Sequence, residues 1–285
     1  LPVIPLGIHS DDFNFTDEFK RKSREELGIE KDDIAFVFVG RLSFHAKAHP
    51  FPMYKALDNA SKSLKEGSKI HLIQTGWFPN DYIKNTFIDD AKNICPQIEC
   101  HFLDGRIEEN KMKSLAGSDI FISLSDNFQE TFGITPLEGM ASGLPVIVSD
   151  WDGYRDTVRD GIDGFTIPTT TLEAQDNKDL VSNYLFDNLN YDLYMGYASQ
   201  TVSIDIDICT KRIIELIVNK DLRLKMGASA KKIAKNSFDW KEIIKLYSNL
   251  RFQLNEIRNI SKNVKSISYI STINPYNIFE DYSSN

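Results

Sequence analysis

The chain has 285 residues, 41% of them hydrophobic and 26% charged, which is typical of a soluble globular protein and argues against a disordered or fibrous one. The formal net charge of −8 and the pI near 5.2 argue against a general nucleic-acid-binding surface. Cys95, Cys100 and Cys209 are too few and too scattered for a disulfide framework or a zinc cluster, so they indicate reduced thiols of a cytoplasmic protein.

The amino-terminal part predicts a linker followed by alternating helices and strands. No apolar run is long enough to cross a bilayer. Because the chain starts at Leu1 without a methionine, we expect it to begin within a longer protein, and a targeting segment removed from its front is compatible with the sequence. In chain order the apolar runs and helical periods predict a linker or strand at Leu1–Gly7, a helix at Phe19–Leu27, a strand at Ile34–Val39, a helix at Pro50–Leu64, a strand at Ile70–Gln74, a helix at Asp81–Asn93 and a strand at His101–Leu103.

The same alternation continues to residue 167. It predicts a helix at Glu108–Leu115, a strand at Asp119–Leu124, a short helix beginning near Thr135 and ending at 141–143, a strand at Leu144–Val148, a helix at Tyr154–Arg159 and a strand at Gly164–Ile167. Six strands alternating with helices predict an α/β fold, a Rossmann-like, doubly wound and mostly parallel sheet with extra C-terminal helices. The chain has neither G-x-G-x-x-G after its first strand nor a P-loop, which disfavours a nicotinamide or flavin enzyme.

Beyond residue 168 the pattern weakens. Residues Thr169–Ser203 carry several tyrosines without a clear period and are interpreted as an insertion. Three helices are expected at Lys211–Val218, Asp221–Lys235 and Trp240–Ile257, and from Ser261 a tail is expected to wrap a surface or fray, so we divide the chain into a domain at 1–250 and a helix end with tail at 251–285. Lys211–Lys265 holds 14 basic and 5 acidic residues, which permits peripheral contact with anionic lipid, although a solvated helical face is the commoner explanation.

The stretch Phe128–Val146 carries the strongest signal for a binding site. Glu130 lies in a polar turn and Glu138 a little over one turn inside the following helix, so both carboxylates can face a ligand over the helix start, where unpaired N–H groups favour anions. Gly133 lets the backbone approach such a ligand. The alternative without a binding function is that both glutamates cap and solvate a surface helix.

Two cations follow the first expected strand at the same sheet edge as Glu130. Arg41 and Lys47, together with the helix start, suit a diphosphate, and two carboxylates suit the hydroxyls of a sugar and a ribose. The combination indicates a nucleotide sugar.

These segments resemble a known family. VIPLGI, FVGRLSFHAK, QETFGITPLEGMASGLPVIVSD, GYRDTV and DGIDGF are similar to the carboxyl-terminal domain of GT-B retaining glycosyltransferases of family 4, the glycosyl transferases group 1, over about Leu1–Pro168 and more loosely over Lys211–Leu250. The resemblance implies a transferase that moves a sugar from a UDP- or GDP-sugar to a glycan or lipid acceptor with retention, in the cytoplasm or at the inner membrane face, with no nucleic-acid partner.

The resemblance also implies roles for individual residues. Arg41, Lys47 and Glu130 would be catalytic, the cations stabilising the diphosphate and Glu130 binding the donor sugar. Glu138 would bind the ribose, and no metal or other cofactor is implied because the cations replace it. The further donor-binding residues implied are Gly40, Arg106, Ile107, Phe132, Gly133, Ile134 and Thr135.

Two departures from the family pattern stand out. Lys47 is followed by Ala48-His49-Pro50 where the family usually continues Lys-Gly, so the loop could differ in shape, and His45 and His49 become candidates for phosphate contacts beside the commoner reading as loop histidines without function. The insertion at Thr169–Ser203 has no family counterpart. Asp150 and Asp152 could be metal ligands, but a turn explains them more simply.

The sequence is also compatible with functions other than a complete glycosyltransferase. A GT-B enzyme needs an amino-terminal acceptor domain, so this chain would be the donor half and inactive alone. A non-catalytic nucleotide-sugar-binding scaffold or sensor would keep the fold but would not need all four charged residues. A GT-B sugar-nucleotide epimerase would fit the Phe132-Gly133 and glutamate spacing less well.

Overall fold

A computed structural model describes residues 2–260, except for the side chains of residues 174 and 175. The expected tail from Ser261 lies outside the described residues. Residues Pro5–Ile243 form one compact unit, and residues 2–4 and 244–260 belong to a second unit. The sheet and the candidate site lie in the first unit.

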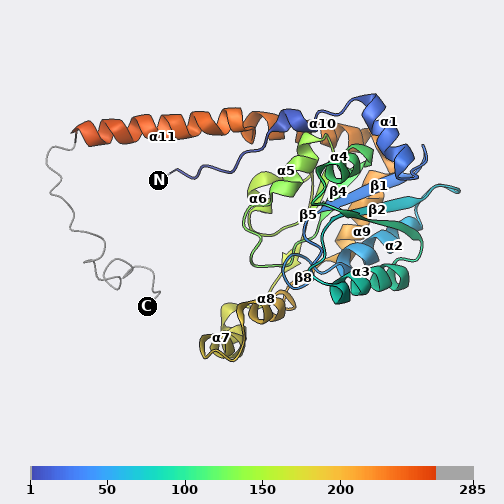
Figure 1. The fold of residues 1–285 in the computed structure, drawn as a ribbon, viewed down its shortest axis with the longest axis horizontal. Helices are drawn as coiled ribbons and strands as arrows, with labels where there is room; N and C mark the ends of the chain where they lie inside the picture. The colour runs from blue at the N-terminus through green and yellow to red at the C-terminus, as the bar shows by residue number, and fades with distance from the viewer. Residues whose placement is uncertain (1, 261–285) are drawn as a thin grey trace. The chain divides into compact units, whose positions relative to one another are not determined.

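The first unit is built on a six-stranded sheet of order β3-β2-β1-β4-β5-β6 in which every pairing is parallel (Figure 1). This confirms the doubly wound fold expected from the alternation. The strands are β1 (Ile34–Val39), β2 (Ile70–Gly76), β3 (Ile98–Asp104), β4 (Ile120–Ser123), β5 (Val146–Ser149) and β6 (Gly164–Ile167).

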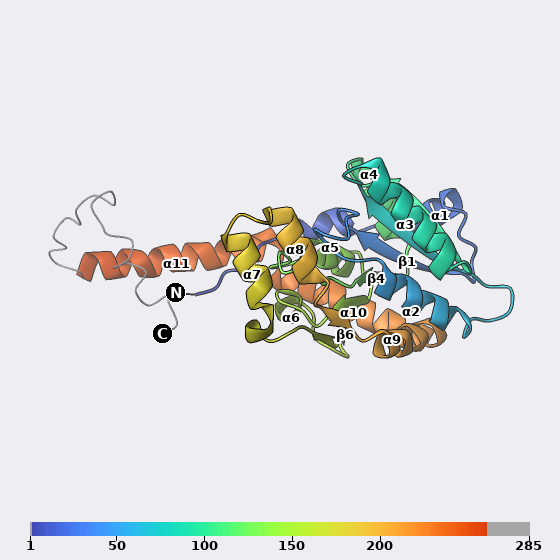
Figure 2. The ribbon, with the colours of Figure 1, turned by 90° about the horizontal axis from the view of Figure 1, so that it is seen from below.

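Helices cover both faces of the sheet because its central strands are apolar on both sides (Figure 2). Phe36 of β1 packs into the core beneath α2 (Phe51–Ser61), α3 (Asp81–Ile94) and α9 (Ile206–Val218). Its neighbour Val37 packs into the opposite core. That core is covered by η1 (Ser10–Phe13), α1 (Asp17–Glu26), α4 (Glu108–Gly117), α5 (Ile134–Ala141) and α10 (Lys220–Ser237). A short α6 (Tyr154–Thr157) follows β5, and α11 spans Trp240–Ile260.

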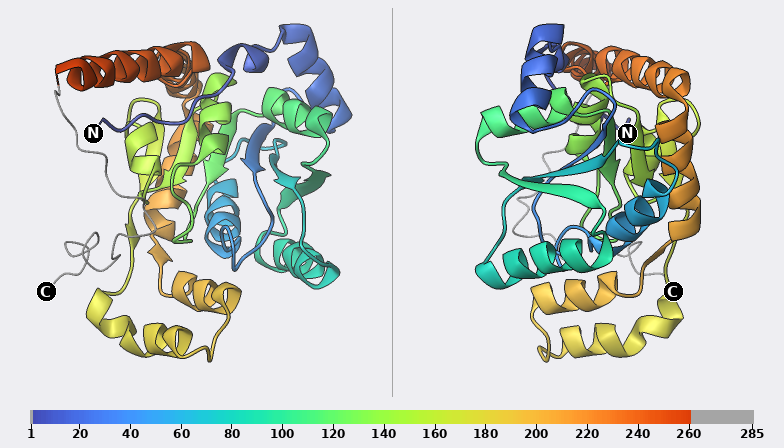
Figure 3. Two further views of the ribbon diagram at one scale, coloured as in Figure 1. Left: turned by 60° about the vertical axis from the view of Figure 1, so that its left-hand side comes forward. Right: turned by 90° about the vertical axis from the view of Figure 1, so that its right-hand side faces the viewer.

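The insertion is more ordered than its sequence suggested. It contains β7 (Thr169–Thr170), η2 (Ala174–Asn177), α7 (Lys178–Leu185), α8 (Tyr191–Ser199) and β8 (Ser203–Ile204), with β7 and β8 pairing antiparallel. Figure 3 shows the helices of this segment in yellow at the lower end of both views. Tyr184 stacks on Tyr194 at a centroid distance of 4.5 Å, and Asn190 caps α8 by accepting the Leu193 N–H at 2.9 Å. These local contacts, rather than a long apolar stripe, define the two helices, which is why periodicity did not reveal them.

Some expected boundaries were wrong. β3 is longer than His101–Leu103 because it is an edge strand, whose partly exposed polar residues break the apolar run. The helix expected to start at Lys211 begins at Ile206, where Asp205 caps it by accepting the Ile208 N–H.

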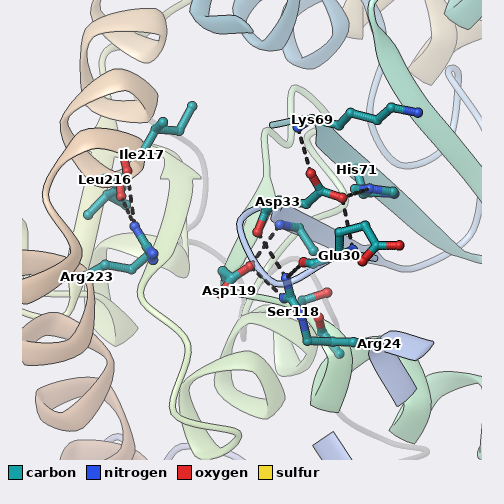
Figure 4. Close-up of polar contacts among 12 residues, drawn as sticks. Arg24, Glu30, Asp33, Lys69, His71, Ser118, Asp119, Leu216, Ile217 and Arg223 are labelled. Atoms are coloured by element: carbon teal, nitrogen blue, oxygen red, sulfur yellow. Dashed lines mark hydrogen bonds and ion pairs between the residues drawn. The ribbon is translucent and has the colours of Figure 1, made fainter. Parts of the chain in front are cut away.

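Polar contacts hold the amino ends of the central strands together (Figure 4). Asp33 accepts the Lys69 N–H at 2.8 Å, and its Oδ2 lies 3.0 Å from His71 Nε2. Asp119 accepts the Ala35 N–H and pairs with Arg24, both at 2.9 Å. This edge is therefore structural, and the opposite, carboxyl edge is free for chemistry.

Candidate functional site

Glycines let three strand ends approach one another at the carboxyl edge. A Cβ on Gly76 would lie 1.8 Å from the Gly40 carbonyl oxygen, and a Cβ on Gly105 would lie 2.9 Å from Gly76 Cα. Gly40 itself donates its N–H to Thr75 O at 3.0 Å. The loops that follow β1, β2 and β3 consequently leave the sheet side by side.

The loop after β1 carries Lys47 on a single closed turn. The Lys47 and Ala48 N–H groups both donate to Ser43 O, at 3.0 and 3.3 Å. Among the non-glycine residues described, positive φ angles occur only at Asp152 and Asp187, so Ala48 needs no glycine-like conformation. Alanine therefore replaces the family's usual glycine here without backbone strain.

Lys47 and Glu130 meet in the site as an ion pair between Nζ and Oε2. Glu130 is only 6% exposed, and its Oε2 also accepts the hydroxyl of buried Tyr154 at 3.2 Å. Tyr154 in turn lies 2.9 Å from Ser123 Oγ at the end of β4. The carboxylate is thus held between the Lys47 ammonium and the buried Tyr154 hydroxyl, a position from which it can accept a ligand hydroxyl.

The start of α5 presents backbone rather than side chains to the site. Gly133 occupies the N-cap position with φ of 80°, and no side chain caps the helix. A Cβ at Gly133 would lie 2.1 Å from Tyr154 Cε1, so glycine is required by both conformation and space. Ile134 is exposed and Thr135 half-buried at this end. The helix therefore offers its first N–H groups to an anion.

Glu138 is held by a second ion pair. Its Oε1 lies 2.9 Å from Lys111 Nζ, which comes from α4. Burial raises the pKa of Glu138, and the charge and hydrogen bond of Lys111 oppose that rise. Lys111 also lies over the Phe13 ring, 5.7 Å from its centroid. The carboxylate is a preformed acceptor with limited freedom.

The remaining cations of the expected site lie at its rim. Arg41 is exposed, with its guanidinium 5.8 Å from the Trp77 ring centroid. Arg106 is exposed and pairs with Asp104 at 2.7 Å, and its hydrogen bonds lower the pKa of Asp104 to about 2. Ile107 is half exposed and precedes α4. These side chains are available to a ligand, but no contact ties them to Glu130.

The loop histidines and the turn aspartates have separate settings. His45 Nδ1 lies 3.3 Å from Ser43 Oγ, and the His49 N–H donates to Asp126 Oδ2 at 3.1 Å. Asp150 pairs with Arg155 at 2.9 Å, and Asp152 has a positive φ in the turn before α6. The structure places Asp152 in the expected turn, and both the absence of a metal role for the aspartates and a phosphate role for either histidine stay predictions.

Two partners of the glutamates escaped the sequence reasoning. Tyr154 was noted only as the start of a helix, and Lys111 only as part of one. Position alone could have drawn attention to both, because each follows a strand of the same sheet edge. No rule of spacing pairs Lys111 with Glu138, since the two helices meet only in the folded chain.

The described residues contain neither a metal-binding cluster nor a membrane-spanning helix. Within residues 2–260, no group of three or more His, Cys, Asp or Glu side chains is arranged to hold a metal ion. In the same range, no helix combines the length and apolar character needed to span a bilayer.

Comparison with known proteins relates this geometry to one family. The family model described as glycosyl transferases group 1 matches residues 19–202. A protein of Methanocaldococcus jannaschii described as an uncharacterized glycosyltransferase is 25% identical over 214 residues, which cover 70% of this chain and 51% of that protein.

Solved structures share the fold at low identity. WaaG, described as a glycosyltransferase involved in lipopolysaccharide biosynthesis, superposes with a TM-score of 0.60 and 18% identity over 86% of this chain and 55% of that one. The C-terminal domain of a glycosyl transferase group 1 family protein, LpcC from Francisella tularensis, gives 0.51 and 18% identity over 82% of this chain and 100% of that domain. The fold is thus that of GT-B C-terminal domains. The chain spans only 36–51% of the length of the first curated relatives that it matches.

Proposed function

The chain belongs to the glycosyl transferases group 1 family, and from this premise we propose that it binds the nucleotide-sugar donor for transfer of a hexose to a glycan or lipid acceptor. The observation that carries the proposal is the Lys47–Glu130 pair with Tyr154 behind it, directly beside the uncapped start of α5. One positive charge, one fixed carboxylate and a row of N–H groups match a diphosphate joined to a sugar.

Each group has a role in this proposal. Lys47 and Arg41 bind the diphosphate, and Lys47 stabilises the charge that develops on it. Glu130 leaves its ion pair to accept hydroxyl groups of the donor sugar. Glu138 accepts the ribose hydroxyls, and its partner Lys111 opposes the rise in pKa that burial causes. Gly40 and the backbone at Phe132, Gly133 and Ile134 approach sugar and phosphate, Thr135 reaches the distal phosphate, and Arg106 with Ile107 lies near the base.

The reaction we propose exchanges one bond to the anomeric carbon for another. The bond between the anomeric carbon and the diphosphate oxygen breaks, and the nucleoside diphosphate leaves with the electron pair. An acceptor hydroxyl forms the new glycosidic bond and loses its proton to the departing diphosphate. We infer retention of the anomeric configuration from the family resemblance. A second domain supplies the other wall of the cleft, so this chain alone binds donor but transfers little.

Calorimetry on the chain with UDP, GDP, ADP and their sugar conjugates tests donor binding. We expect one base to be preferred. Glu138→Ala should weaken nucleotide binding about 10- to 100-fold, because a charge-assisted hydrogen bond is lost. Lys47→Ala should weaken the binding of a nucleoside diphosphate more than the binding of the corresponding nucleoside.

The exposed Lys62, which follows the last residue of α2, provides the matched control. Lys62→Ala removes a charge of the same kind and should leave the affinity unchanged. If the folded chain binds no nucleotide, or if Lys62→Ala weakens nucleotide binding as much as Lys47→Ala does, the proposal of donor binding is wrong. The scaffold alternative is then favoured.

A further inference from the structure

The insertion forms one wall of an open cavity that lies outside the proposed donor site. Its volume is about 920 Å³. One wall is the loop of Phe44, His45 and His49 with Phe51 and Pro52 at the start of α2, and the other is α8 with the residues that follow it. Gly196 of α8 lies close to His45, since a Cβ there would come within 3.2 Å of His45 Cβ. The insertion thus builds a pocket of ligand size.

The lining carries no permanent positive charge and suits a neutral, hydroxyl-rich ring. Of the described residues that line the cavity none is Lys or Arg, and two, Asp126 and Asp192, are acidic, so the lining favours a neutral ligand over a phosphate or nucleotide. Amide, imidazole and hydroxyl groups alternate with aromatic faces. A saccharide ring has the matching chemistry, with hydroxyls at its rim and C–H groups on its face that pack against aromatic rings. The polar lining comprises His45, His49, Asn190, Tyr197, Ser199 and Gln200.

Asp126 is an incomplete polar group at this cavity. It is 5% exposed, its Oδ2 accepts the His49 N–H at 3.1 Å, and its Oδ1 has no partner among the described residues. Leaving a buried carboxyl oxygen without a hydrogen-bond partner is unfavourable. Burial raises the pKa of Asp126 to about 7. Oδ1 has no accessible surface in the structure, so the Asp126 side chain must turn toward the cavity that it lines before a ligand hydroxyl can reach this oxygen.

The cavity and the donor site share their two loops. Ser125 Oγ donates to Lys47 O at 3.2 Å, and Asn127 Nδ2 donates to His45 O at 3.0 Å. Lys47 on the first loop pairs with Glu130, which follows Asp126 by four residues on the second. A ligand in the cavity is therefore held by the same loops that carry the proposed diphosphate and sugar contacts.

We propose that this cavity binds a neutral saccharide unit of the acceptor, packed against Tyr197 and hydrogen-bonded through the Asp126 carboxyl. The acceptor role rests on the proposed donor function, whereas saccharide binding itself does not. Under this proposal the insertion, which shapes one wall of the cavity, serves to bind the acceptor. The part of the acceptor that contacts the cavity is then a neutral sugar and not an anionic headgroup.

Saturation-transfer NMR on the 285-residue chain tests the proposal directly. The probes are neutral disaccharides of glucose, galactose, mannose and N-acetylglucosamine, with glucose 6-phosphate as the anionic comparison. We expect saturation of the ring protons of at least one neutral probe and none of glucose 6-phosphate. Tyr197→Ala should weaken binding about fivefold or more, as expected when one aromatic contact is lost.

Tyr191 gives a matched control on the same helix. It is 50% exposed against 48% for Tyr197 and does not belong to the cavity lining. Tyr191→Ala should leave saccharide binding intact, and Asp126→Asn should weaken it while the amide spectrum keeps its dispersion. Absence of any neutral saccharide signal, or an equal loss in Tyr191→Ala, overturns the proposal.

Nucleotide calorimetry on the same samples separates the two proposals. Nucleotide binding without saccharide binding overturns the cavity assignment and leaves the donor function standing. Saccharide binding without nucleotide binding overturns the donor function and with it the acceptor role. Binding of both, with Tyr197→Ala affecting only the saccharide, supports both.

Discussion

Three buried or nearly buried carboxyl groups define the site at the scale of single residues, and each has a different partner. Glu130 has Lys47 and Tyr154, Glu138 has Lys111, and Asp126 has one N–H and an unpaired oxygen. Sequence spacing singled out the two glutamates, because they flank a helix start. It did not single out Asp126, since burial and a missing partner are properties of the folded chain alone.

The raised pKa of Asp126 predicts a pH dependence of stability. The folded state holds the proton up to a pKa of about 7, whereas the unfolded state releases it near 3.8. The stabilising contribution is thus complete below 3.8 and is lost as pH rises through about 7. Between pH 5 and pH 8 the free energy of unfolding of the wild type should fall by about 2 kcal/mol relative to Asp126→Asn.

Urea denaturation of the two proteins at both pH values measures this difference. Comparison with the variant removes the contributions of histidines, which titrate in the same range in both proteins. The exposed Asp192→Asn serves as the control and should follow the wild type at both pH values. A constant difference between wild type and Asp126→Asn would contradict the assignment.

At the scale of elements, close packing of backbone against side chain positions the site. The loop before α5 approaches Tyr154 so closely that only glycine fits at position 133. The same need for space recurs at Gly153, where a Cβ would lie 2.3 Å from Thr131 O. These contacts join the β4–α5 and β5–α6 connections, and they place the Tyr154 hydroxyl on Glu130.

Gly133→Ala should therefore damage both stability and the site. A left-handed alanine costs about 1–2 kcal/mol, and the clash with Tyr154 adds overpacking of about 1–3 kcal/mol. Gly67→Ala is the matched control, because Gly67 has a similar φ of 85° and no atom within 4 Å of its Cβ position. Thermal and urea denaturation should show the larger loss for Gly133→Ala, and equal losses would refute the packing argument.

At the scale of the whole unit, the two ends of Pro5–Ile243 close on each other. Ile8 donates its N–H to Phe238 O at 2.8 Å, and Trp240 donates to Ile8 O at 3.0 Å. Asp239 accepts both the N–H and the hydroxyl of Ser10, at 3.1 and 2.5 Å. A Cβ on Gly7 would lie 2.6 Å from Trp240 Cδ2. The amino-terminal segment is thereby fixed to the start of α11.

Asp239→Asn should lower the free energy of unfolding by about 1–3 kcal/mol, because hydrogen bonds to a buried charge are weakened. Burial by itself would raise the pKa of Asp239, but the Ser10 and Lys241 contacts outweigh it and lower the pKa below its usual value of 3.8. Its stabilisation is thus present above pH 3.8 and lost as pH falls through the folded-state pKa.

Denaturation at pH 7 and pH 2.5 checks this prediction. The wild type and Asp239→Asn should differ at pH 7, and the difference should be smaller at pH 2.5. Asp12→Asn, at an exposed position of η1, is the control and should match the wild type at neutral pH. A difference that persists unchanged at pH 2.5 would contradict a charge-dependent closure.

Local sequence patterns were sufficient to predict the sheet, the family and the residues at the strand ends. Continuous apolar runs such as Ile34–Val39 identify strands buried on both faces, and parallel strands necessarily bring the residues after them, Lys47 and Glu130 among them, to one edge. Local patterns were sufficient for these features because strand burial and helix starts depend on neighbouring residues.

The hydrogen-bond and ion-pair partners of the carboxyl groups, and the cavity, depend on how the chain folds. Tyr154 reaches Glu130, Lys111 reaches Glu138, and α8 reaches the loop of His45 across separations along the chain that no local pattern spans. Burial likewise leaves one oxygen of Asp126 unpaired and raises its pKa. Each depends on which surfaces the packed helices bring together, because desolvation and hydrogen bonding arise from spatial neighbours and not from neighbours in sequence.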